Sequence, residues 1–140
     1  MPFHPENVNY LAVLVAGVIA FAIGAIWYTA LFGKKWRDLQ GITEAKMKEM
    51  QDKMNPPIFF GGMLVSYFVL GYAMAVILTG LTEHSATIGA LFGFFAWLAI
   101  GSVMMTNHIA SGHKIGIYLI DVGCVLVYTI AMGVLLAVWR

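Results

Sequence analysis

Four long apolar runs constrain this chain more than any other feature of its 140-residue sequence. The first covers roughly residues 8–32 and the second roughly residues 58–81, and neither contains a charge. The third covers roughly residues 86–106. The fourth covers roughly residues 115–139 and contains one charge, Asp121. About 20 consecutive apolar residues cross a hydrocarbon layer of about 30 Å as a helix, so each run is long enough to span a membrane.

The composition excludes an ordinary soluble domain. Hydrophobic residues make up 61% of the chain and charged residues 11%, whereas soluble domains are roughly half apolar and roughly a quarter charged. A chain this short leaves much of its surface exposed, so many of its apolar side chains would be in contact with water if the protein were soluble. The runs are apolar on all sides, which favours helices over barrel strands. We therefore predict an all-α integral membrane four-helix bundle, a single transmembrane domain over residues 1–140.

Positive charges gather in the polar loop, residues 33–57, which holds six of the eight Lys and Arg residues. Lys114 lies in the turn between the third and fourth runs, whereas the N-terminal tail and the turn at residues 82–85 have none. The positive-inside rule then places the loop and the third turn in the cytoplasm and both termini outside. The N-terminus lacks a basic leader region, so the first run is expected to be a retained span. The net charge of +1 gives no support for nucleic-acid binding.

The polar loop is predicted to form a short amphipathic helix on the cytoplasmic membrane face. Gly41 marks a break, and Thr43 is a suitable N-cap for the residues that follow. One face of this helix carries three methionines, Met47, Met50 and Met54. The helix would be a connector that covers the end of the bundle, or else a gate or a docking surface for a partner.

Aromatic and basic side chains flank the end of the first run, where such side chains prefer the headgroup level. The predicted interface anchors are Trp27, Tyr28, Lys34, Lys35, Trp36 and Arg37.

Small residues recur every four positions in all four runs. The longest such ladder is Ala12, Ala16, Ala20 and Gly24 in the first run. Shorter pairs are Gly62–Ser66, Gly71–Ala75, Gly89–Gly93 and Gly133–Ala137. Such faces let membrane helices approach closely. These faces would either pack within a tight monomer or form contacts between copies of the chain. We expect a homo-oligomer in the lipid bilayer. A further protein partner is a second option.

Asp121 is the main candidate for chemistry, because an intramembrane acid is by default a functional-site hypothesis. It lies about 10 Å along the helix from Lys114, at about 1.5 Å per residue. The predicted intramembrane polar site consists of Asp121, Cys124, Tyr128, Ser102, Thr106 and Asn107. Its acid would be a structural group hydrogen-bonded to hydroxyls of other helices, or a proton or cation site. Cys124 is expected to pack, because a thiol in apolar surroundings stays protonated.

Metal and cofactor sites have little support. His4, Glu6, Glu83 and His84 share the predicted outer side and are weak candidates for a divalent ion. His108 and His113 lack the i,i+4 spacing of a two-histidine helix site and are expected at the membrane interface. No cofactor and no catalytic residue is predicted.

The stretches NYLAVLVAGVIAFAIGAIWYTALFGKKW and YTIAMGVLLAVW resemble the bacterial family of small membrane proteins known as DUF1761. The most specific residues are Trp27, Tyr28, Phe32, Gly33, Lys34, Trp36, Met132, Gly133 and Trp139. The resemblance implies four spans in the bacterial inner membrane and supplies no activity. It also implies a polar residue, not always aspartate, at position 121, which favours a hydrogen-bonding role.

Three classes of function stay open. A small solute or ion transporter or channel would use the face of Asp121, and the lone acid slightly favours it. An accessory or scaffold subunit would use the small-residue faces and the loop helix. The sequence lacks spans interrupted by Gly and Pro, which many transporters use to bind their substrates, and this lack favours the accessory or scaffold role. A lipid-modifying enzyme is the least supported. A cavity that reaches Asp121 would discriminate the first class from the second.

Overall fold

A computed structural model describes residues 2–140, and within that range all regular secondary structure is helical, with no strand. The four long helices are α1 (Tyr10–Ile26), α4 (Pro56–Thr79), α5 (Ala86–Ser111) and α6 (Ile115–Val138). The shorter elements are the 3₁₀ turn η1 (Pro5–Asn7), the π-helical turn η2 (Trp27–Leu31), α2 (Gly33–Gln40) and α3 (Glu44–Lys53).

Four stretches are long and apolar enough to cross a membrane, which confirms the expected number of long apolar helices. They are Tyr10–Leu31, Pro56–Thr79, Ala86–Ser111 and Ile115–Val138. The third continues to Ser111, beyond its predicted end at residue 106, and so carries Asn107 and His108 on the same helix.

The helix ends follow from local chemistry. The Oγ1 atom of Thr43 accepts a hydrogen bond from the backbone N–H of Lys46, which confirms Thr43 as the N-cap of α3. Asn55 and Ser85 cap α4 and α5 in the same way. Gly41 ends α2 and Gly112 ends α5 with positive φ angles of 69° and 68°, a conformation that glycine adopts without steric cost.

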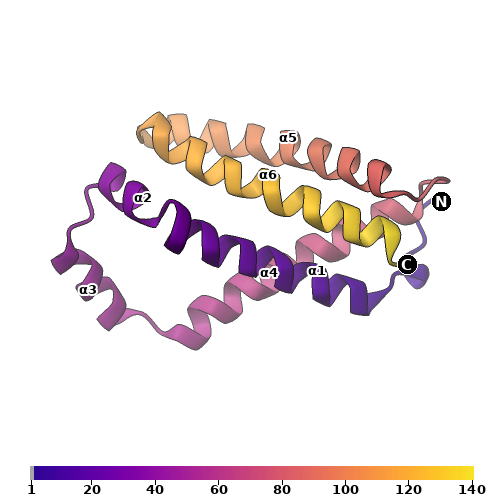
Figure 1. Cartoon of the computed structure of the whole chain (residues 1–140), viewed down its shortest axis with the longest axis horizontal. Helices are drawn as coiled ribbons and strands as arrows, with labels where there is room; N and C mark the ends of the chain where they lie inside the picture. The colour runs from indigo at the N-terminus through magenta and orange to yellow at the C-terminus, as the bar shows by residue number, and fades with distance from the viewer. Residues whose placement is uncertain (1) are drawn as a thin grey trace.

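α6 is the central helix. It packs along the length of α5 and also contacts α1 and α4. Figure 1 shows α5 and α6 side by side, α1 alongside α6, and α4 crossing α1 and diverging toward α3. The arrangement is therefore splayed on the side of the first half of α4. Both termini lie at one end of the molecule, and α2, α3 and the α5–α6 turn lie at the other.

Glycines bring α5 and α6 into backbone contact. A Cβ atom on Gly93 would collide with the carbonyl of Thr129 and lie 2.7 Å from the Cα atom of Ile130. A Cβ atom on Gly89 would collide in the same way with the carbonyl of Gly133. The small-residue pairs of these two helices therefore face each other inside one chain.

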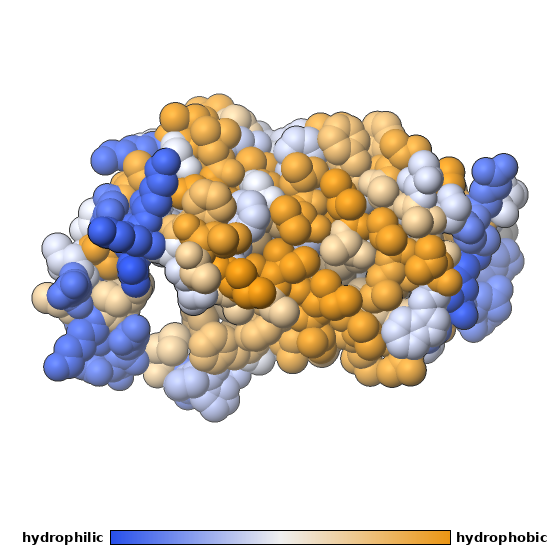
Figure 2. Space-filling model, in the orientation of Figure 1, coloured by the Kyte–Doolittle hydropathy of each residue, from blue (hydrophilic) through white to orange (hydrophobic). Residues whose placement is uncertain are grey.

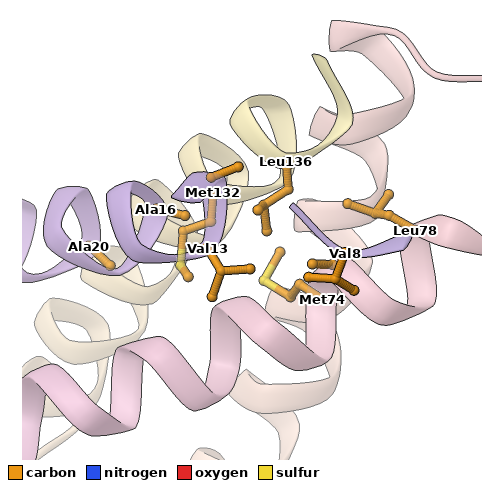
Figure 3. Packing of buried hydrophobic residues seen from close by; sticks show 10 residues of the cluster. Val8, Val13, Ala16, Ala20, Met74, Leu78, Met132 and Leu136 are labelled. Carbon is orange, nitrogen blue, oxygen red and sulfur yellow. The ribbon is translucent and has the colours of Figure 1, made fainter. Parts of the chain in front are cut away.

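The apolar core lies in the half of the molecule near the termini. Side chains of α1, α4 and α6 point toward one another there, as Figure 3 shows for Ala16, Met74 and Met132. Ala12, Ala16 and Ala20 are 0% exposed. The small-residue ladder of α1 thus packs against other helices of the same chain. This face therefore gives no support to the expected homo-oligomer.

The outer surface separates apolar and polar side chains. Figure 2 shows an apolar middle with hydrophilic side chains at both ends, and one of these ends is formed by α2 and α3. Large apolar side chains such as Val18, Phe95 and Val103 are exposed in the middle, as suits contact with lipid.

The polar loop contains two helices where one was predicted. α2 packs against α6 and against η2. α3 stands apart from the long helices (Figure 1), and none of its residues is buried. Its position on a membrane face stays a prediction.

Candidate functional site

Asp121 is held by two aromatic donors. Its Oδ1 atom accepts a hydrogen bond of 2.6 Å from the hydroxyl of Tyr28 and one of 3.1 Å from Nε1 of Trp36. Tyr28 belongs to η2, and Trp36 belongs to α2. The carboxylate therefore joins three segments at the end of the molecule opposite the termini.

The π-helical turn η2 brings these donors to α6. The turn is closed by a 2.8 Å hydrogen bond from the Phe32 N–H to the Trp27 carbonyl, and such turns often occur at functional sites. Gly33 lets the first residue of α2 lie directly against the backbone of η2, since a Cβ atom there would lie 2.5 Å from the carbonyl oxygen of Tyr28. The ring of Trp36 meets that of Tyr28 edge to face at 5.7 Å. The two donors therefore converge on one oxygen.

Neighbouring positions of α6 are held by the same kind of contact. Nε1 of Trp27 donates to the carbonyl of Ile120 at 2.9 Å, and Nε1 of Trp97 donates to the carbonyl of Val122 at 2.9 Å. Aromatic donors thus reach three successive residues of α6 from α2, η2 and α5. Trp27, Tyr28 and Trp36, predicted as headgroup anchors, are bonded to α6, whereas Lys34 and Lys35 are exposed.

A surface pocket of about 220 Å³ that is open to the outside, called the cavity below, reaches Asp121 from the α5–α6 turn. Its polar lining is Asn107, His108, Ser111, His113, Tyr118 and Asp121. The ring of His108 lies 5.8 Å from that of His113 and 5.6 Å from that of Tyr118. The Nε2 atom of His108 is buried and has no hydrogen-bond partner within residues 2–140. Two imidazoles and a carboxylate are therefore part of the lining of one cavity.

Asp121 has no cationic partner in the described part of the chain. The ion pairs found there are His4–Glu6, Lys46–Glu49 and Lys53–Glu49. Only neutral groups, the phenol and the indole, bond the carboxylate. The lack of a cation at the acid agrees with either of its two predicted roles.

The other members of the predicted polar site divide into three groups. Cys124, 2% exposed, and Tyr128 lie on α6, where Tyr128 packs edge to face on Tyr67 at 5.2 Å. Ser102 and Thr106 are exposed and donate to carbonyls of their own helix. Asn107 shares the cavity with Asp121, and Ser102 and Thr106 do not.

Sequence reasoning missed Tyr28 and Trp36 as partners of the acid. A ring with a polar hydrogen at the end of a span fits a headgroup anchor and an intramolecular donor equally well. It also assigned His108 and His113 to the interface without linking them to Asp121. The extension of α5 to Ser111 is what brings these histidines to the cavity.

The weak metal candidates do not form one site. Nδ1 of His4 lies 2.9 Å from Oε1 of Glu6, whereas His84 contacts Arg140. The pKa of Glu6 is lowered by a backbone hydrogen bond and by its bond to His4. Across residues 2–140, no three His, Cys, Asp or Glu side chains come together as metal ligands.

These features define a small, multi-pass helical membrane protein with a polar site near one end. The chain belongs to the DUF1761 family, described as protein of unknown function, whose model matches residues 11–137. The match includes nearly all of the four membrane-crossing helices, and it confirms the family that the sequence resembles. Comparison with curated proteins and with solved structures gives no match.

Proposed function

We propose that this protein transports a proton or a small cation across the membrane, with Asp121 as the residue that binds it. The observation that carries the proposal is the cavity at Asp121. An acid that served only to join helices would need its hydrogen-bond donors and no polar opening. Here the acid has both, and the opening is lined by the two imidazoles of His108 and His113.

The charge of the site supports a positive ligand. Tyr28 and Trp36 fix one oxygen of Asp121 without neutralising it. An ionised carboxylate inside a membrane is costly unless a proton or a cation joins it. An imidazole ring can both donate and accept a proton, so His108 and His113 suit the entrance of a proton path.

The opposite half of the molecule is closed. Thr129 and Met132 on α6 are 0% exposed, as is Ala16 on α1. This closely packed core between α1, α4 and α6 favours a carrier that changes conformation over a permanently open channel. We infer the bacterial inner membrane as its location, with α2, α3 and the α5–α6 turn in the cytoplasm. The positions of the Lys and Arg residues support this orientation.

Flux into liposomes tests the proposal. Purified protein is reconstituted with the pH-sensitive dye pyranine inside, and a potassium gradient with valinomycin drives proton entry. A second set contains a sodium indicator. We expect flux above that of protein-free liposomes for one of the two ions. Asp121→Asn should reduce that flux by at least about tenfold, since the variant cannot take up a proton or hold a cation by charge.

Asp52→Asn is the matched control, because Asp52 is exposed on α3 and loses the same charge. It should keep the wild-type flux. Equal flux from Asp121→Asn and wild type would show that Asp121 does not bind the transported ion. No flux of protons or sodium through the wild type would contradict transport of these ions.

An accessory or scaffold role is the second candidate, and α4 supplies the observation that favours it. A Cβ atom on Gly62 would meet no other atom within 4 Å, and Ser66 one turn later is exposed. This small-residue face is thus available to a helix of another subunit or of a second copy.

In a Cys124→Ala background, Gly62→Cys should cross-link between copies under oxidation in membranes, whereas Gly17→Cys, on a buried face, should not. Absence of cross-linking at Gly62 would argue against a homo-oligomer through this face.

A further inference from the structure

A second cavity, of about 590 Å³, lies between α2 and α3. It has the size typical of small-molecule sites, about 300–1,000 Å³. Three cationic side chains line it, Lys34, Arg37 and Lys48, and so do two carboxylates, Asp38 and Glu44. Figure 2 shows hydrophilic side chains gathered at this end of the molecule. The cavity is separate from that of Asp121, with which it shares no lining residue.

The five charged side chains of this cavity are not paired. None of them forms an ion pair within 4.0 Å with another of the residues 2–140. On the same helix α3, by contrast, Glu49 lies 2.9 Å from Lys53 and 3.6 Å from Lys46. The cavity therefore presents charges of both signs that stay apart, with three cations against two carboxylates.

We propose that this cavity binds the headgroup of a zwitterionic phospholipid, phosphatidylethanolamine. Its phosphate would lie among Lys34, Arg37 and Lys48, since Lys and Arg are the side chains that bind phosphate by charge-assisted hydrogen bonds. Its ammonium group would lie against Asp38 and Glu44. A ligand with both charges matches this lining better than a simple anion, which the two carboxylates would repel.

The position of the cavity argues for a lipid over a soluble phosphate. The first membrane-crossing stretch ends at Leu31, and Lys34 follows within one helical turn. Headgroups lie directly outside the hydrocarbon layer, so a phosphate at Lys34 is at headgroup level. Ile42 and Met47 add apolar atoms to the lining, which suit the glycerol and the first acyl carbons.

Lipid binding to delipidated protein in detergent tests the proposal, with dissociation constants measured by native mass spectrometry. The ligands are phosphatidylethanolamine, phosphatidylglycerol with the same acyl chains, free phosphoethanolamine and inorganic phosphate. Wild type should bind phosphatidylethanolamine most tightly. The triple variant Lys34→Gln, Arg37→Gln, Lys48→Gln should bind it at least about tenfold more weakly, since it loses every charged donor to the phosphate.

The matched control is Lys46→Gln, Lys53→Gln, Lys114→Gln, which removes the same charge from the same end of the molecule and does not alter the cavity lining. It should bind as wild type does. An equal loss in both triple variants would show a general charge effect and overturn the proposal. Binding of free phosphate as tight as that of the lipid would assign the site to a soluble ligand and overturn it too.

The carboxylates have their own test. Asp38→Asn with Glu44→Gln should abolish the preference for phosphatidylethanolamine over phosphatidylglycerol. An unchanged preference would overturn the role of the ammonium group. Asp121→Asn should bind lipid as wild type does, so a failure of the transport proposal and a failure of this one are distinguishable.

Discussion

The hydroxyl of Tyr28 donates a 2.6 Å hydrogen bond to Oδ1 of Asp121 and so ties the end of the first membrane-crossing stretch to the last helix. The indole of Trp36 adds a second bond to the same oxygen at 3.1 Å. The acid is thus a point at which η2, α2 and α6 are fixed to one another. The position of α2, and with it one wall of the cavity between α2 and α3, depends on these bonds.

Tyr28→Phe should lower the free energy of unfolding in detergent by about 0.5–2 kcal/mol. A hydrogen bond to a charged group contributes about 1.5–3 kcal/mol in water-soluble proteins, but side-chain bonds within membranes average about 0.6 kcal/mol. Thermal or denaturant unfolding measures the change. Tyr10→Phe removes an exposed hydroxyl that makes no described bond and should have no effect. Equal stability of the two variants would show that the bond to Asp121 contributes nothing.

Gly93→Ala should destabilise the α5–α6 pair by about 1–3 kcal/mol, because an added methyl group forces closely packed helices apart. The methyl group would meet the backbone of Thr129 and Ile130, which cannot rotate away. Gly61→Ala is the control. It adds the same methyl group where no atom lies within 4 Å, and alanine favours the helix by about 1 kcal/mol. Circular dichroism during heating should show opposite shifts for the two variants.

The sequence predicts the elements of this fold better than their contacts. Hydrophobic run length identifies the four spans, and Thr43 identifies the start of α3. The spans are apolar on all sides, however, so no periodic pattern tells which face of a helix packs. That is why the sequence predicts the small-residue ladder that includes Ala16, but does not predict that this ladder packs against α4 and α6 of the same chain.

The site shows the same limit. Asp121 is visible in the sequence as the one charge in its run. Its partners depend on the π-helical turn at Trp27–Leu31, which shifts the following residues relative to a regular helix. No residue in that turn signals it, because tertiary contacts to α6 stabilise it. The cavity likewise depends on how far α5 continues beyond residue 106.

Ala16→Leu should destabilise the chain strongly, by about 1–3 kcal/mol or more, because the larger side chain has no space in a filled core. Ala16 is 0% exposed between α1, α4 and α6. Size-exclusion chromatography with light scattering should show an unchanged oligomeric mass for the folded fraction. A reduced mass with unchanged stability would instead show that this ladder lies between copies. Val18→Leu, on the exposed face of α1, is the control and should be neutral.

The orientation in the membrane should be measurable with single cysteines in a Cys124→Ala background. Glu6 and Glu83 lie near the end that holds the termini, and Glu49 lies on α3 at the other end. An impermeant maleimide added to intact cells should label Glu6→Cys and Glu83→Cys and should leave Glu49→Cys unlabelled. Permeabilised cells should allow labelling at all three positions. Labelling of Glu49→Cys alone in intact cells would invert the orientation.

Asp121→Asn and Asp121→Leu should separate the structural from the transport role of the acid. Asparagine keeps an oxygen that accepts from Tyr28 and Trp36, so its unfolding free energy should stay close to that of wild type. Leucine offers no acceptor and leaves both donors unsatisfied, at a cost of about 1–3 kcal/mol. Both variants should lose flux, because neither carries a titratable group. A leucine variant more stable than wild type would show that the cost of burying the acid exceeds the contribution of its two hydrogen bonds. The acid would then be retained for transport at the expense of stability.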